Sequence, residues 1–154
     1  MSTGLFGRIL VPVASEPDAR ETATAVRPIL TGDGGTGIFV YVVEKAGGAP
    51  DKASVEQRET YAQKLFDGVH AVLEGQGLSY ETDVLYGTDI GEAIIEGAHA
   101  HQADGIAFTP RGGSRWLKLL TGDVTETLVS SSDLPVIVLP KADSGSGTRP
   151  PPMN

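Results

Sequence analysis

The chain contains no cysteine, so disulfides and thiolate-based metal or redox sites are excluded. With three histidines in all, a multi-histidine metal site is not expected, and His99 and His101 are predicted at an exposed helix end. No apolar stretch approaches the roughly 20 residues that cross a bilayer. The N-terminal run Ile9–Val13 is too short for a signal peptide. We therefore expect a cytoplasmic protein without membrane insertion.

Positive charge is also scarce, because 12 lysines and arginines stand against 20 acidic residues, giving a net charge of −8. Broad binding of nucleic acid or of an anionic membrane would need a basic face, so neither partner is expected. The remaining composition, 40% hydrophobic and 21% charged over 154 residues, is ordinary for a globular domain. We predict one α/β domain over residues 1–140 and a disordered Gly/Ser/Pro-rich tail over residues 141–154.

Five short apolar segments alternate with stretches of helical pattern. Strands are predicted at Arg8–Ala14, Ile38–Val43, Leu78–Tyr86, Gly105–Thr109 and Pro135–Leu139. Helices are predicted from Ser15 to about Arg27 with Pro28 bending or ending the helix, then over about 54–74, 90–101 and 123–131. Strands that alternate with helices predict an open parallel sheet with helices on both faces. The alternation in the third strand is typical of a half-exposed edge.

In such sheets a ligand binds beyond the carboxyl ends of the strands, where the strand order reverses. We expect the ends of the first and fourth strands, Pro12–Ala14 and Phe108–Thr109, to face each other there. The following stretch contains Gly112–Gly113 and three cations, and it reaches the start of a helix at Asp123. A glycine-bearing turn into a helix N-terminus favours anions, because its N–H groups are unpaired and the helix dipole is positive there.

Three segments together resemble the universal stress protein family, over about residues 6–140. Arg8–Val13 resembles the first strand of the family and Leu134–Leu139 the last strand. Gly112–Glu126 resembles the family's nucleotide loop, Gly-x2-Gly-x9-Gly-Ser/Thr. The resemblance implies a flavodoxin-like five-stranded parallel sheet of order 3-2-1-4-5 and a regulatory or protective role. It also implies binding of ATP or another adenine nucleotide in some members, with Mg²⁺ only alongside the nucleotide.

The resemblance further implies a homodimer that pairs through the last strand, Val136–Leu139. An exposed apolar edge strand favours such pairing on physical grounds as well. Gly112 and Gly122 match the second and third glycines of the loop, whereas Thr109 replaces the first glycine and Asp123 replaces the serine or threonine. The binding residues expected are Pro12, Val13, Ala14, Val42, Phe108, Thr109, Arg111, Gly112, Gly113, Gly122, Asp123, Val124 and Thr125.

Ala14 matches an aspartate that meets the nucleoside in ATP-binding members, and Val42 matches a position that flanks the adenine. Several of these residues also have a structural interpretation. The paired glycines suit a turn with positive φ. Asp123 with Glu126 is typical of a capping box and is favoured over a metal ligand. The cations Arg111, Arg115 and Lys118 are candidates for phosphate contact, Arg111 first because it adjoins Gly112, but a solvated loop surface is the favoured interpretation.

No nucleophile with a plausible base and no carboxylate pair placed for hydrolysis is found, so dedicated catalysis and a metal site are not expected. Three functions therefore stay open. The first is an adenine-nucleotide binder of reduced affinity. The second is a protein-interaction module that binds no nucleotide and serves an unidentified protein partner. The third is a nucleotide hydrolase or transferase that uses the same site.

Overall fold

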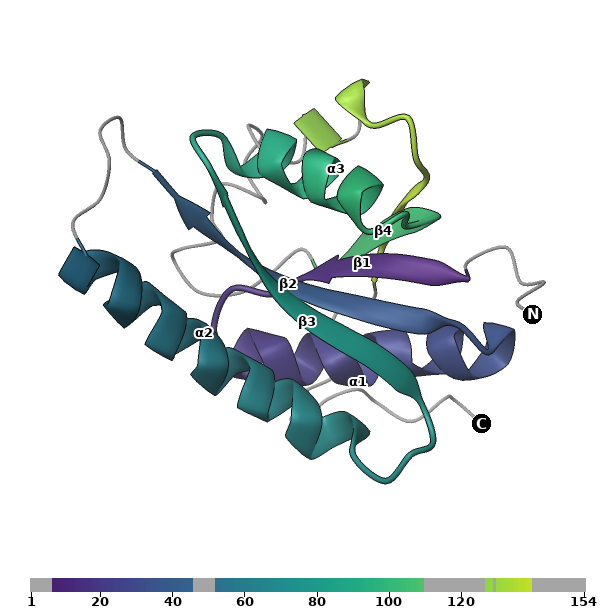
Figure 1. Cartoon of the computed structure of the whole chain (residues 1–154). Helices are drawn as coiled ribbons and strands as arrows, with labels where there is room; N and C mark the ends of the chain where they lie inside the picture. Colours follow the sequence, from purple (N-terminus) through teal and green to yellow (C-terminus); the bar gives the residue numbers. More distant parts are fainter. Residues whose placement is uncertain (1–6, 46–51, 110–126, 129, 140–154) are drawn as a thin grey trace, which may run out of the picture.

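The computed structural model describes residues 7–45, 52–109, 127–128 and 130–139. These residues form a five-stranded parallel sheet of order β3-β2-β1-β4-β5, which confirms the predicted fold (Figure 1). The strands are β1 (Arg8–Pro12), β2 (Thr36–Glu44), β3 (Ser79–Gly87), β4 (Gly105–Phe108) and β5 (Val136–Val138). The helices are α1 (Glu16–Asp33), α2 (Lys52–Leu73) and α3 (Ile90–Ala100). The division into a domain and a disordered tail remains a prediction, because residues 140–154 lie outside the described residues.

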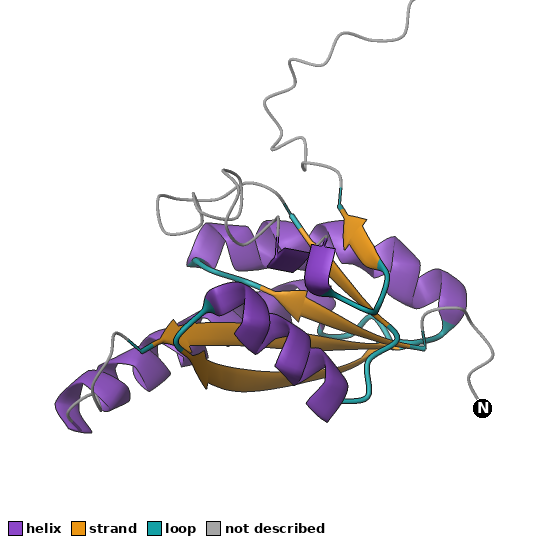
Figure 2. Ribbon diagram, turned by 90° about the horizontal axis from the view of Figure 1, so that it is seen from above, coloured by secondary structure: helices purple, strands orange, loops and turns teal. Residues whose placement is uncertain are grey.

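Helices cover both faces of the sheet. Side chains of β1 alternate between the faces, so Ile9, Val11 and Val13 pack with α1 and α2. Leu10 and Ala14 pack on the opposite face with α3 and Leu128. Figure 1 shows α1 and α2 below the sheet and α3 above it, and Figure 2 shows successive strands turning relative to one another. The central strands are buried on both faces, as their continuous apolar runs predict.

The helix α1 continues past the position at which the sequence predicts a bend or an end. Ser15 caps it, accepting a hydrogen bond from the Asp18 N–H at 3.3 Å. Pro28 lies inside the helix, so the helix does not end there, and the turn expected at Thr31–Gly37 is shortened to Gly34 and its neighbour. Pro28 is exposed, so its ring crowds no neighbouring element, whereas Leu30 is fully buried. Burial of the last helical turn therefore offsets the cost of the proline.

Replacing Pro28 by alanine should raise the free energy of unfolding by about 2 kcal/mol. An internal proline costs a helix about 3 kcal/mol relative to alanine, and the more flexible unfolded chain returns about 1 kcal/mol of that gain. Urea unfolding measures the difference, with Thr31→Ala in the same helix as the control. A Pro28→Ala variant no more stable than the unaltered protein would contradict this account.

The end of α3 differs from prediction at one of its two histidines. His99 is half-exposed, as expected, and its Nε2 lies 2.7 Å from Asp133 Oδ1. His101 was predicted to be exposed, but its side chain is 23% exposed and its Nε2 lies 2.7 Å from Asp83 Oδ2 on β3. The carboxylate on the edge strand draws the ring onto the sheet. Among the described residues, no helix is long and apolar enough to cross a membrane.

The edge strand β3 is tied to α2 by Tyr86, whose hydroxyl donates to Glu59 Oε2 at 2.6 Å. This hydrogen bond, together with partial burial and nearby carboxylates, raises the pKa of Tyr86 to about 12 from its ordinary 10.0. Because the folded pKa is the higher one, deprotonation favours the unfolded chain. The stabilisation from Tyr86 is therefore present below pH 10 and lost as the pH rises toward 12.

A tyrosinate absorbance titration tests this interaction. Subtracting the curve of Tyr86→Phe from that of the unaltered protein should leave a single transition with a midpoint near pH 12. Glu59→Gln should move that midpoint toward 10, because it removes the carboxylate that accepts from the hydroxyl. A midpoint near 10 in the unaltered protein would show that the hydrogen bond does not hold in solution.

Candidate functional site

The carboxyl ends of β1 and β4 lie side by side at the point where the strand order reverses. Leu10 pairs with Ile106 in the parallel register, so the next residues of both strands emerge together. After β1 the chain crosses to β2 on one side, whereas after β3 it crosses over to β4 on the other. The end of β1 is held by the Val13 N–H, which donates to the Val40 carbonyl at 2.9 Å. This is the switch point at which such sheets bind ligands.

The described candidate residues divide between the two faces of the sheet. Ala14, Val42 and Phe108 belong to the face covered by α3. Val13 packs with α1 and α2, and the Thr109 hydroxyl bonds to Thr22 of α1. Alternation along a strand separates the two sets, because consecutive side chains point to opposite faces. The structure therefore brings the candidate residues to one edge without directing their side chains into one space.

Most of these side chains are buried. Val13, Ala14 and Phe108 are 0%, 0% and 1% exposed, and Pro12 is buried as well. Val42 is half-buried, and it packs against the α3-side core. A ligand at this edge would consequently meet main-chain groups of β1 and β4 and part of the Val42 side chain. The sequence predicts these residues as ligand contacts. Their burial indicates that they would support the candidate site from behind instead of lining it with their side chains.

The stretch between β4 and the next described residues begins and ends at this edge. It begins after Thr109, at the end of β4. It ends at Thr127, which is helical and lies against the first turn of α3. A Cβ on Gly91 would lie 2.9 Å from Thr127 Cβ, so only glycine permits this approach. The α3 N-terminus follows β3 and is itself capped at this edge by Asp89, whose Oδ1 accepts from the Glu92 N–H at 2.9 Å.

The loop residues of the candidate site lie outside the described residues, so their roles remain predictions. They are Arg111, Gly112, Gly113, Gly122, Asp123, Val124 and Thr125.

Sequence reasoning missed two residues that lie directly behind the edge. Asp18 and Thr22 are 4% and 0% exposed on the face of α1 that packs on the sheet. Asp18 Oδ2 accepts from the Ala14 N–H at 2.9 Å, and Thr22 contacts Thr109. Asp18 lies in the first turn of α1, where an acidic side chain also suits the positive end of the helix dipole. The spacing of four residues, which places both polar side chains on one helical face, was the available signal.

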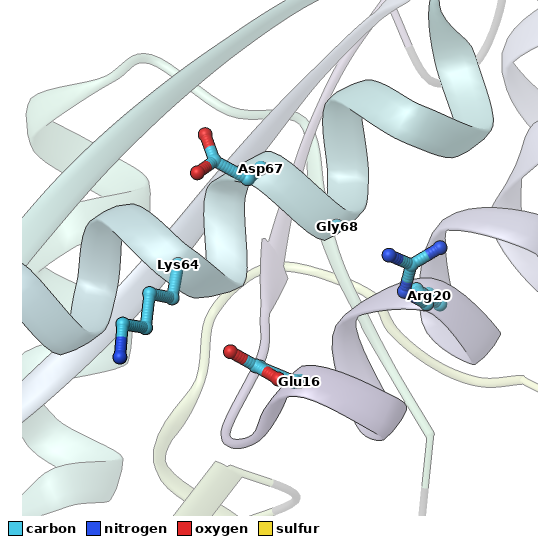
Figure 3. Close-up of a pocket in the computed structure, with 5 residues that line it drawn as sticks. All are labelled: Glu16, Arg20, Lys64, Asp67 and Gly68. Carbon is cyan, nitrogen blue, oxygen red and sulfur yellow. The ribbon is translucent and has the colours of Figure 1, made fainter.

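A separate hollow opens between α1 and α2 and has a volume of about 170 Å³. Figure 3 shows Glu16 and Arg20 on α1, facing Lys64, Asp67 and Gly68 on α2. The two helices approach closely at Gly68, where a Cβ would lie 3.3 Å from Arg20 Cγ. Among the described residues that line the hollow, two carboxylates stand against two cations, and none of these is a sequence-predicted site residue. In the described part of the chain, no group of three or more acidic or histidine side chains is placed to hold a metal ion.

Residues 5–140 match the model of the universal stress protein family. The chain belongs to this family. Among curated relatives, the stress response protein NhaX of Bacillus subtilis (strain 168) is 33% identical over 81 residues, which are 53% of this chain and 48% of that protein. The match thus spans about half the length of the relative.

Solved structures of the family share the fold. A family member from Burkholderia pseudomallei superposes with a TM-score of 0.68 at 20% identity, over 89% of this chain and 98% of the other. The universal stress protein from Archaeoglobus fulgidus in complex with dAMP gives a TM-score of 0.63 at 15% identity, over 89% and 100% of the two chains. At these identities the likeness establishes the fold alone.

Proposed function

We propose that this universal stress protein binds an adenine nucleotide with reduced affinity at the carboxyl ends of β1 and β4, and that it acts as a regulatory or protective protein of the cytoplasm. One observation carries the proposal. The glycine-bearing stretch predicted to hold phosphates follows Thr109, directly after β4 at the switch point, and precedes Thr127, which lies against the first turn of α3. The dAMP complex of the Archaeoglobus fulgidus protein supports the choice of ligand class.

Reduced affinity follows from two positions. At the position of Ala14, ATP-binding members of the family carry an aspartate. Ala14 offers only a fully buried methyl group there, so a side-chain hydrogen bond to the nucleoside is lost. Asp123 places a carboxylate where the loop motif has a neutral hydroxyl. Repulsion between a carboxylate and a phosphate at about 4 Å is about 1 kcal/mol in water and about 4 kcal/mol at an effective dielectric near 20.

Calorimetric titration with Mg-ATP, ADP and AMP tests the proposal. We expect saturable binding that Gly112→Val abolishes, because an added side chain would block the close approach of phosphate to the loop backbone. Gln76→Val, at an exposed position in the turn between α2 and β3 on the opposite edge, is the matched control and should bind normally. No binding at millimolar nucleotide would overturn the proposal. Mg²⁺ would bind only through the phosphates.

A second candidate function is that of an interaction module that binds no nucleotide and works through its dimer surfaces. The observation in its favour is the exposed outer side of β5. This strand pairs with β4 on one side only, and its Val138 is 57% exposed. Binding to an unidentified protein in the absence of nucleotide would support it. A nucleotide hydrolase or transferase is a third candidate, and it requires turnover of ATP above a buffer blank.

For each of these candidate functions we propose a homodimer that pairs through Val136–Leu139. Val138→Glu should convert the dimer to a monomer, because it places two like charges in the two-fold contact. Light scattering coupled to gel filtration measures the mass. Glu81→Gln, on the opposite edge strand β3, is the control and should leave the mass unchanged. A monomeric unaltered protein, or a Val138→Glu variant that remains dimeric, would exclude this interface.

A further inference from the structure

The buried polar side chains of the described residues form one connected group. They are Asp18, Thr22 and Thr109, with exposed fractions of 4%, 0% and 4%. Thr22 Oγ1 lies 3.2 Å from Asp18 Oδ1 and 2.9 Å from Thr109 Oγ1. Asp18 Oδ2 accepts from the Ala14 N–H at 2.9 Å. A single chain of hydrogen bonds therefore joins the end of β1, the first turns of α1 and the end of β4.

The direction of these hydrogen bonds follows from the number of hydrogens available. An ionised carboxylate only accepts, so Asp18 takes the Ala14 N–H on one oxygen and the Thr22 O–H on the other. Thr22 has then used its one hydrogen, so it accepts from the Thr109 hydroxyl. Thr109 is the terminal donor, and it is fixed to α1 across 87 residues of sequence.

Asp18 and Thr22 have different roles in this group. Asp18 satisfies the buried Ala14 N–H, which an aliphatic side chain would leave unpaired. The Thr22 hydroxyl links Asp18 to Thr109. The group thereby fixes two main-chain segments, at Ala14 and at Thr109, that flank the switch point. These are the segments through which a ligand at this edge would be contacted, because the adjoining side chains are buried.

The group also explains how a threonine is accommodated where the loop motif has its first glycine. Thr109 directs its side chain to α1, whereas Ala14, Val42 and Phe108 face α3. The larger residue therefore leaves the α3 side of the edge free.

We propose that the Asp18–Thr22–Thr109 group is a positioning device for nucleotide binding, with Thr22 as the residue that connects the two strand ends. The inference rests on the proposed function. Thr22 does not contact the ligand. It holds the main chain at Ala14 and Thr109 in the arrangement that receives the nucleotide.

The test compares Thr22→Val with Thr22→Ser. Valine keeps the shape of threonine but removes the hydroxyl, which leaves Thr109 without its acceptor and Asp18 without one donor. We expect Thr22→Val to raise the Kd for Mg-ATP by about tenfold or more and to speed hydrogen exchange of the Ala14 amide. Serine keeps the hydroxyl and should bind within about twofold of the unaltered protein, although it loses a buried methyl group. Thr24→Val is the matched control, since Thr24 is exposed on the same helix.

Each outcome decides the inference. An unaltered protein that binds no nucleotide overturns both the proposed function and the positioning role. Binding by the unaltered protein with an equal Kd for Thr22→Val overturns the positioning role alone. Equal weakening in the valine and serine variants also overturns it, because serine keeps the hydroxyl and should then have preserved binding. If Thr22→Val does not fold, Thr109→Val against Thr109→Ser gives the same comparison at the strand end, where one donor is removed.

Discussion

Asp123→Ser should tighten the binding of Mg-ATP by between about fivefold and several-hundredfold. The range corresponds to removing a repulsion of about 1 to 4 kcal/mol between the carboxylate and a phosphate. Serine is also a favoured N-cap residue, so the change removes the charge while keeping the capping group that the sequence predicts. Calorimetric titration of both proteins with the same nucleotide measures the change.

The control for Asp123→Ser is Asp67→Ser, which removes the same charge from the exposed surface of α2. It should leave the Kd within about twofold, because a charge on a solvated surface is largely screened. Unchanged affinity in Asp123→Ser would show that the carboxylate does not face the phosphates. Weaker binding would indicate instead that Asp123 helps to hold the Mg²⁺ that accompanies the nucleotide.

Phe108→Ala should lower the free energy of unfolding by about 3 to 5 kcal/mol, the cost of emptying a packed aromatic site. Phe108 is 1% exposed at the end of β4 and belongs to the core under α3, with Ile94 and Leu128. The sequence predicts Phe108 as a binding residue. Because its side chain is buried, we infer that it packs beneath the carboxyl ends of the strands and stabilises them.

Urea unfolding measures the effect of Phe108→Ala, and Gln76→Ala in the exposed turn after α2 should cost less than about 1 kcal/mol. Phe108→Leu should recover most of the lost stability, since it refills much of the cavity. A loss below about 1 kcal/mol in Phe108→Ala would contradict this packing role and would leave ligand contact as the interpretation of this side chain.

The fold was predictable because each strand carries a local pattern that its final position preserves. The continuous apolar run of β1 identifies a strand buried on both faces, and the alternation in β3 identifies an edge. Alternation of strands with helices then leaves few topologies for a parallel sheet. Helix caps at Ser15 and Asp89 were also recognisable, because capping depends on residues within one turn.

The departures from prediction all depend on contacts between distant residues. The helix α1 passes Pro28 because Leu30 finds a buried place against the sheet. His101 turns inward because Asp83 lies opposite it on β3. The Asp18–Thr22–Thr109 group requires the end of β4 to pack on α1, and no local pattern indicates that pairing. The place of the candidate site follows from topology, whereas the direction of its side chains follows from the register of β1 and β4.

The central claim, that an adenine nucleotide binds at the carboxyl ends of β1 and β4, is tested most directly by titrating isotope-labelled protein with Mg-ATP and recording backbone amide shifts. We predict saturable shifts at Ala14, Val42 and Thr109, with none at Ser79 on the opposite edge. Shifts confined to Glu16 and Lys64 would place the ligand in the hollow between α1 and α2. That result, or the absence of any shift at millimolar nucleotide, would contradict the claim.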